Sequence, residues 1–355
     1  MKILDRYIGK VVAISILAAI SILLAFDLFL ALLRELDEVG QGQYNMTEVF
    51  IYLFLSLPKR IYTFFPMAAL LGSIVGLGLM ASNSELTVMR ASGVSLMRIV
   101  GSLMKVGVLM LVVVVLIGEI IAPFTEKAAE NRRSVKISDQ ITLQTKYGFW
   151  ARDGISYINI RDIKYGGDIA DIYIYEFDDQ HRLRISTYAK RASYEDDKWI
   201  LQDIVQSRIT SQGVKSQRVA RAVLEDTLLD PGLLDAVIVR PEHMSIWNLY
   251  QYINYLKSNG QTAEKFQLAY WTKIFAPISM AVMIFLAAPF VFGPLRSVGI
   301  GARILVGTLF GIGFNIINKG FSNLGVVYDL NPVMSALAPS LVFLVIAVIM
   351  MRRVY

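Results

Sequence analysis

Residues 64–93 read FFPMAALLGSIVGLGLMASNSELTVMRASG, an apolar run that passes without a break into a short polar stretch and a glycine. The apolar part fits a helix that crosses the hydrocarbon core of a membrane, which takes about 20 residues. In the polar part, Ser82 and Glu85 have the spacing of a capping box, which begins a helix. Gly93 is a typical helix stop. The sequence therefore predicts a short, separate helix between two membrane spans.

Apolar runs of the same kind extend over most of the chain. Its 355 residues are 55% hydrophobic and 18% charged, which departs from soluble domains in the direction of a membrane protein. Residues 49–57 are also apolar, but Pro58, Lys59 and Arg60 interrupt the apolar run, so they predict an interfacial helix that leads into the second span. Six runs are long enough to span a bilayer, and they cover residues 9–33, 61–81, 99–121, 269–292, 302–321 and 332–351.

Basic residues distinguish the two sides of the predicted spans. By the positive-inside rule, the side with the excess of Lys and Arg in short loops faces the cytoplasm. The rule predicts both termini and residues 81–98 in the cytoplasm, and residues 122–268 outside. The net charge of +6 then reflects these flanks and not nucleic-acid binding. The basic residues on the predicted cytoplasmic side are Lys2, Arg6, Lys10, Arg90, Arg98, Arg296, Arg303, Arg352 and Arg353.

The segment between the two groups of three spans has a different pattern. Residues 155–163, 171–177, 183–194 and 199–209 alternate apolar and polar positions, with many β-branched and aromatic side chains. Turns at Gly166-Gly167, Asp178-Asp179 and Asp196-Asp197 separate them. This order predicts an antiparallel meander in a sandwich, jelly roll or half-barrel. A rigid domain that docks partners and an open apolar groove for a lipid chain fit this alternation equally well.

The chain thus divides into three parts. We predict spans one to three with the short helix 82–93 in residues 1–121, the β domain in 122–268, and spans four to six in 269–355. Within the second part, residues 242–266 predict an amphipathic helix that returns to the membrane, because Ile246, Leu249, Ile253 and Leu256 recur at helical spacing. The fold class is mixed: six membrane helices plus an antiparallel, jellyroll-like β domain.

Motifs for enzyme chemistry are missing from the sequence. It has no cysteine, no phosphate-binding G-x-x-x-x-G-K-[ST] loop and no H-E-x-x-H pair. His181 and His243 each stand alone, so no serine-histidine-aspartate triad is available. The sequence predicts a chain without enzyme activity, bound cofactor or metal of its own, which leaves a transporter subunit, a channel or a scaffold.

The short helix has two interpretations. In the first, it is a surface turn in the headgroup layer and Glu85 only caps it. In the second, it inserts into a groove of a soluble partner that moves the flanking spans. Leu86, Met89 and Arg90 then supply a shared face, and Glu85 pairs with a basic residue of the partner.

Two motifs carry a resemblance to a known family. The stretch 64–93 together with FGPLRSVGIGAR (292–303) resembles the lipopolysaccharide export permeases, the LptF/LptG family, and the arrangement of spans matches across the whole chain. LDRYIGK (4–10) and FGPLRSV (292–298) are closer to its LptG branch than to its LptF branch. The resemblance implies a bacterial inner-membrane protein with a periplasmic β-jellyroll domain.

The resemblance also implies partners and a mechanism. The chain would form an ABC exporter with LptF, two copies of the ATPase LptB, and LptC, and the ATPase would bind ATP and Mg²⁺. The exporter would extract lipopolysaccharide from the outer leaflet of the inner membrane and pass it to a periplasmic protein bridge. The short helix would be the coupling helix, with Glu85 as its ionic contact. The rival hypothesis is a membrane scaffold that docks periplasmic proteins and transports nothing.

Basic residues near the outer ends of the spans are the candidates for lipid contact. Arginine suits bidentate binding of phosphate, although each residue also fits an ordinary interface anchor. Arg133 matches the basic vestibule position of the family best. The family also has basic residues where this chain has Ala31 and Asp37-Glu38. The candidates are Arg34, Arg132, Arg133, Lys136 and Lys319.

Six further positions within the spans invite a structural or functional explanation. Asp27 is an ionisable residue inside a span, which is a functional-site hypothesis by default, and we expect it to bond polar groups of a neighbouring helix. Glu119 is expected to be structural. Gly307 and Gly311 have the small-x-x-x-small spacing of closely packed membrane helices, as have Gly72 and Gly76. In the family, spans 1 and 5 line a lateral opening against LptF, so Gly307 and Gly311 fit either that gate or packing within the chain.

Overall fold

The computed structural model describes residues 3–137, 149–153, 156–163, 169–178, 180, 182–195, 198–210, 213–224, 241–293 and 298–354. The chain divides into two compact units. A membrane unit comprises Met1–Asp37, Val49–Ala129 and Glu264–Tyr355, and a sheet unit comprises Glu38–Glu48 and Glu130–Ala263. The predicted turns at 166–167 and 196–197, together with Arg296 and His181, lie outside the described residues.

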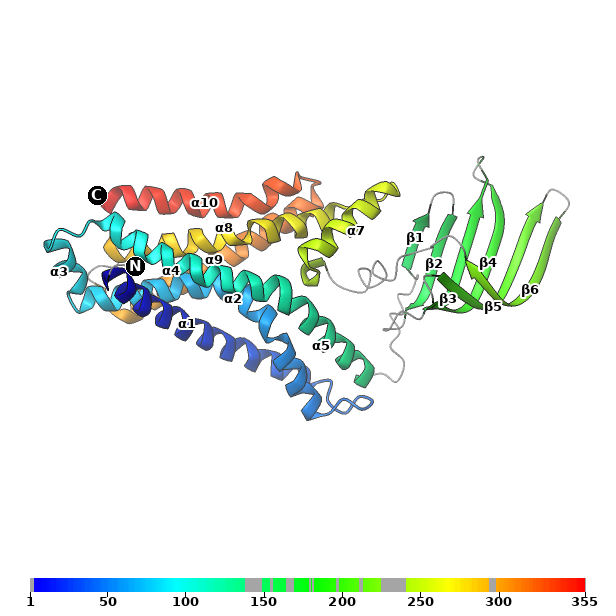
Figure 1. Cartoon of the computed structure of the whole chain (residues 1–355), viewed down its shortest axis with the longest axis horizontal. Coiled ribbons are helices and arrows are strands. Elements are labelled where there is room, and N and C mark those ends of the chain that lie inside the picture. Colours follow the sequence, from blue (N-terminus) through cyan, green and yellow to red (C-terminus); the bar gives the residue numbers. More distant parts are fainter. Residues whose placement is uncertain are drawn as a thin grey trace. The chain divides into compact units, whose positions relative to one another are not determined.

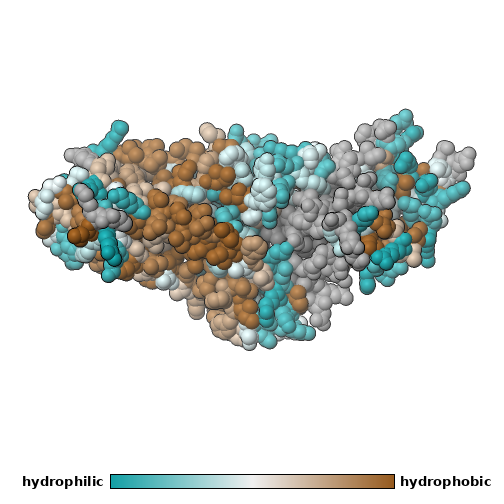
Figure 2. All heavy atoms as spheres, viewed as in Figure 1, coloured by the Kyte–Doolittle hydropathy of each residue, from teal (hydrophilic) through white to brown (hydrophobic). Residues whose placement is uncertain are grey.

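The described residues contain six helices that are long and apolar enough to cross a membrane. Apolar side chains cover much of their visible surface, as a lipid environment requires (Figure 2). The fold class predicted from the sequence is confirmed, because the strands follow the first three of these helices in the chain and precede the last three (Figure 1). The helices are α1 (Ile3–Leu36), α2 (Met46–Ser82), the continuous run of α4, η1 and α5 (Leu96–Ile137), α8 (Glu264–Phe292), α9 (Ile300–Val327) and α10 (Pro332–Val354).

The second span differs from the prediction. Helix α2 runs unbroken through Pro58 and Pro66, so the separate interfacial helix predicted at residues 49–57 is wrong. The charges that suggested a break are neutralised inside the unit, because Lys59 pairs with Glu126 and Arg60 pairs with Asp27. Paired charges do not force the helix to leave the apolar region.

The third span is longer than predicted. Helix α4 (Leu96–Leu116) passes into a π-helical turn η1 (Ile117–Ile121) and then into α5 (Ala122–Ile137). At η1, a Cβ added to Gly118 would lie 2.1 Å from Cδ2 of Tyr62, so the ring of α2 packs directly on the glycine backbone. Such π turns are often found at functional positions in helices.

Helix α2 is the most buried of the six spans and forms the centre of the membrane unit. A Cβ at Gly72 would lie 2.3 Å from the Cα of Ile16, so α1 and α2 approach backbone to backbone at this position. On another side of α2, Gly307 and Gly311 of α9 pack against Leu71 and Met67. The small residues therefore set the close spacing of α1 and α9 on α2.

Six antiparallel strands form one sheet in sequence order. Its buried face is apolar and follows the period-two pattern: Ile158 and Ile160 lie beside Ile172 and Ile174. The four predicted strands are found as β2 to β5, and β1 and β6 were not predicted. The strands are β1 (Phe149–Asp153), β2 (Ser156–Ile163), β3 (Ile169–Phe177), β4 (Leu183–Glu195), β5 (Lys198–Thr210) and β6 (Gly213–Leu224).

Local contacts fix the turn after β3 and the helix that precedes α8. Asp178 accepts the backbone N–H groups of Gln180 and Arg182, both at 2.9 Å, and the N–H of Arg182 is the main cause of the lowered pKa of Asp178. The predicted amphipathic helix is found as α7 (Ile246–Ser258), shorter than the predicted 242–266 because Asn259 ends it. Its buried face carries the predicted Leu249, Ile253 and Leu256, and also Tyr252.

Candidate functional site: the coupling segment and the paired charges

The predicted short helix is α3 (Glu85–Ala91). It follows α2 after a two-residue break and ends at Gly93, whose φ of 86° confirms the predicted glycine stop. The predicted capping box is wrong. Ser82 still belongs to α2 and its hydroxyl donates to the carbonyl of Leu79 at 2.8 Å, so Ser84 takes the N-cap position instead, without a side-chain cap.

Glu85 is turned toward the first helix. The hydroxyl of Tyr7 donates to Glu85 Oε2 at 2.9 Å, and Nδ2 of Asn83 donates to Oε1 at 3.3 Å. The carboxylate is only partly exposed. It therefore connects α3 with the start of α1, a contact between residues 78 positions apart that no local pattern contains.

The other three predicted coupling residues do not share one exposed face. Leu86 is 3% exposed and belongs to the core of the membrane unit, where it anchors α3 from within. Met89 is half-buried against the same core, and Arg90 is exposed. The exposed apolar residue of α3 is Val88, 63% accessible, which the spacing of the other three residues does not indicate.

The start of α1 has a second polar connection. Asp5 is 4% exposed and accepts from Oγ of Ser102 at 2.6 Å and from Nζ of Lys105 at 3.1 Å, both on α4. A buried carboxylate needs such partners, because an unpaired one would be strongly destabilising. The first two turns of α1 are thus held both to α3 and to α4.

A third contact lies at the end of α2. Arg303, in the first turn of α9, is 3% exposed, and its guanidinium donates to the carbonyl of Gly78. Gly78 leaves the room for this side chain, because an added Cβ would lie 2.7 Å from Nη1 of Arg303. A cation is also favourable at the C-terminal end of a helix.

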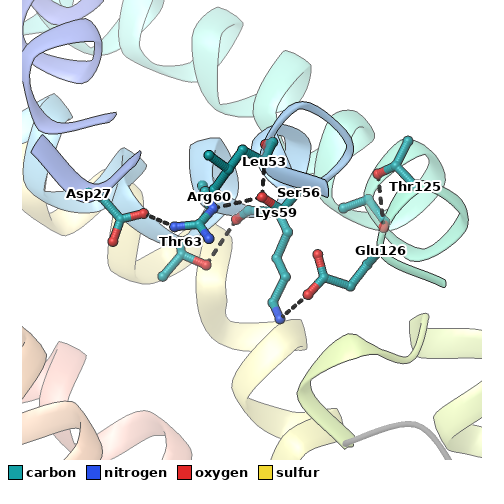
Figure 3. Close-up of polar contacts among 9 residues, drawn as sticks. Asp27, Leu53, Ser56, Lys59, Arg60, Thr63, Thr125 and Glu126 are labelled. Carbon is teal, nitrogen blue, oxygen red and sulfur yellow. Dashed lines mark hydrogen bonds and ion pairs between the residues drawn. The ribbon is translucent and has the colours of Figure 1, made fainter. Parts of the chain in front are cut away.

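Ion pairs join the helices nearer to the other end of the spans (Figure 3). The close-up shows Arg60 of α2 directed at Asp27 of α1, and Lys59 directed at Glu126 of α5, 2.8 Å away. The expectation that Asp27 bonds to a neighbouring helix is confirmed. Glu119 of η1 accepts from Lys273 of α8 at 2.9 Å, which agrees with the structural role expected for it.

Three of the predicted lipid-binding cations lie together in the sheet unit, and each faces a polar side chain of residues 38–48. Nε and Nη2 of Arg132 donate to the two carboxylate oxygens of Glu48, at 2.5 and 3.2 Å. Arg133 pairs with Glu38 at 2.6 Å, and Lys136 donates to Gln43 at 3.4 Å. A phosphate group at this cluster would compete with two carboxylates.

The remaining two predicted cations belong to the membrane unit. Arg34 is exposed and its Nε donates to the carbonyl of Leu30 on its own helix at 3.3 Å. Lys319 is exposed and has no ion pair or hydrogen bond within the described residues. The contacts of Gly307 and Gly311 with α2 support packing within the chain, one of the two alternatives left open. The described residues hold no group of three His, Asp or Glu suited to a metal.

Comparisons with known proteins match nearly the whole chain. The family model "Lipopolysaccharide export system permease LptF/LptG" matches residues 6–353. The lipopolysaccharide export system permease protein LptG of Escherichia coli K12 is 38% identical over 355 residues, which cover 99% of this chain and 98% of the relative. The protein of the same name from Haemophilus influenzae is 39% identical over 344 residues, with 96% of each chain covered.

Proposed function

Because the chain belongs to the lipopolysaccharide export system permease LptF/LptG family, we propose that it is the LptG-type permease subunit of an ATP-driven exporter. The exporter extracts lipopolysaccharide from the outer leaflet of the inner membrane and passes it to a periplasmic protein bridge. Six helices able to span a membrane, together with this family, support a multi-pass inner-membrane protein. We propose that both termini and α3 face the cytoplasm and that the sheet unit faces the periplasm.

Each proposed partner performs a separate task in such an exporter. LptF completes the membrane cavity, two copies of LptB bind ATP with Mg²⁺ and hydrolyse it, and LptC receives the lipid. This chain transmits the work and performs no chemistry. Its own contribution is binding and movement, so the residues that matter are those of α3 and those that meet the lipid.

The observation that carries the proposal is the construction of α3. Leu86 holds it in the core of the membrane unit, whereas Val88 and Arg90 are exposed beside it. A helix anchored on one face and free on the other can bind a soluble partner and pass its displacement to α2 and α4. For the lipid, we propose the basic residues Arg34, Arg132, Arg133, Lys136 and Lys319 as the vestibule.

Charge reversal at Glu85 tests the proposal. The complex would be purified with the ATPase, placed in lipid vesicles, and assayed for ATP hydrolysis and for lipopolysaccharide release to a soluble acceptor. We expect Glu85→Lys to lower lipid release by about tenfold or more, because reversing a charge in a desolvated interface costs about 2 kcal/mol or more. The ATPase should be lost from the complex or fall in rate.

The matched control is Glu242→Lys, which reverses an exposed carboxylate of the sheet unit. It should leave ATP hydrolysis, subunit composition and lipid release unchanged. If Glu85→Lys behaves like this control, α3 is not the coupling element, and a membrane scaffold becomes the better description of the chain.

A further inference from the structure

The start of α1 is the part of the membrane unit that α3 contacts through a side-chain hydrogen bond. Tyr7 is 45% exposed and its ring lies at the surface, so its hydroxyl and not its burial makes the contact with Glu85. A hydrogen bond to a carboxylate is stronger than one between neutral groups. A soluble partner seated on α3 would also exclude water from this bond and strengthen it further.

Helix α1 is suited to movement as a single rod. It is 34 residues long, about 50 Å at 1.5 Å per residue. It is the least buried of the six spans, with outward residues such as Ile22 and Phe26 that are 70% and 64% exposed. A displacement applied at Tyr7 would therefore be carried along the helix to its contacts with α2, at Gly72 and at the Asp27–Arg60 pair.

The bond also explains why α3 can transmit force in a defined direction. Leu86 fixes α3 by apolar contacts, which are not directional. Tyr7–Glu85 adds a directional contact to α1, and Asp5 ties the same two turns of α1 to Ser102 of α4. The start of α1, α3 and the first turns of α4 thus form one polar-linked body.

We propose that Tyr7 is a positioning residue that transmits the displacement of α3 to α1, through its hydrogen bond to Glu85. This inference rests on the proposed function, in which a soluble ATPase moves α3. It assigns Glu85 a second task besides any contact with the ATPase, namely to accept the Tyr7 hydroxyl. Helix α1 then moves with α3 in each transport cycle.

The first experiment removes only the hydroxyl. Tyr7→Phe in the purified complex should leave the ATPase bound and ATP hydrolysis near the wild-type rate. It should lower the lipopolysaccharide released per ATP hydrolysed by about three- to tenfold, the range expected for the loss of an ordinary hydrogen bond at an exposed site. Tyr328→Phe, at an exposed tyrosine of the same unit, is the matched control and should not change this ratio.

The second experiment uses the absence of cysteine from the chain. A Lys10→Cys/Ser92→Cys variant keeps Tyr7 and Glu85, and it carries one spin label on α1 and one directly after α3, both at exposed positions. We expect the distance between the two labels to be the same in the nucleotide-free and ATP-trapped states. Adding Tyr7→Phe should make that distance differ between the two states.

The outcomes separate this inference from the proposed function. If wild-type protein releases lipid and Tyr7→Phe has the wild-type ratio, or if the distance between the two labels changes between the nucleotide states, α1 does not follow α3 and the inference is overturned. If wild-type protein with all partners releases no lipid under ATP, the proposed function itself fails.

Discussion

At the scale of single residues, the membrane unit is governed by the pairing of its charges. Asp27 and Arg60 are 33 positions apart in the chain and both side chains are 18% exposed, so each depends on the other. Glu126 is 7% exposed beside Lys59. Removing one partner of such a pair costs far more than removing both, because a lone buried charge is left behind.

Asp27 provides the test of this pairing. Asp27→Ala should destabilise the protein by about 3 kcal/mol, whereas the double variant Asp27→Leu/Arg60→Leu should recover most of that loss. Thermal unfolding in detergent measures both. Asp37→Ala, at an exposed carboxylate, is the control. Equal destabilisation by the single and the double variant would show that the two side chains do not act as a pair.

At the scale of elements, the spacing of the helices depends on where a glycine permits backbone contact. The Cα of Ile16 occupies the space that a side chain at Gly72 would need. Backbone atoms cannot move aside as a side chain can. A side chain at Gly72 would therefore force the whole of α1 away from α2. By contrast, no atom lies within 4 Å of a Cβ added at Gly101 of α4.

The pair Gly72 and Gly101 therefore gives a matched prediction. Gly72→Ala should destabilise the membrane unit by about 2 kcal/mol through overpacking. Gly101→Ala should be neutral or stabilising by up to about 1 kcal/mol, since alanine is the better helix former. Unfolding in detergent compares the two variants. A destabilised Gly101→Ala with an unaffected Gly72→Ala would refute the close approach of α1 and α2.

At the scale of the whole molecule, the cations proposed for lipid binding differ in whether a carboxylate already pairs with them. Arg133 pairs with Glu38 in the sheet unit, and Lys319 of the membrane unit is exposed. A lipid phosphate can bind the guanidinium of Arg133 only by displacing the Glu38 carboxylate. The acidic residues of 38–48 therefore weaken the proposed vestibule electrostatically while they hold its arginines in place.

Two opposite changes test that balance. The double variant Arg133→Glu/Lys319→Glu should reduce photocrosslinking of lipopolysaccharide to the complex several-fold, about the effect of losing two charge-assisted contacts. Glu38→Gln should increase it, because it releases Arg133. Lys257→Glu, at an exposed residue of α7, is the control. If crosslinking is the same in all of these variants, neither cation contacts the lipid phosphates.

The sequence by itself determined the class of the protein. Apolar length predicts six spans, period-two alternation predicts the four central strands, and Gly93 predicts the end of α3. These features are local, because hydropathy and backbone preference act over a few residues. The motifs in 64–93 and 292–303 then predicted the family, which the comparisons confirmed.

The tertiary structure decided where the polar side chains go. Glu85 has the spacing of a cap, but Tyr7 is brought to it by the packing of α1, and α2 continues through Ser82. In the sequence, Lys59 and Arg60 suggest that the helix breaks, yet Glu126 of α5 and Asp27 of α1 neutralise them. Partners separated by tens of residues leave no periodic signal, since their distance is set by how whole helices pack.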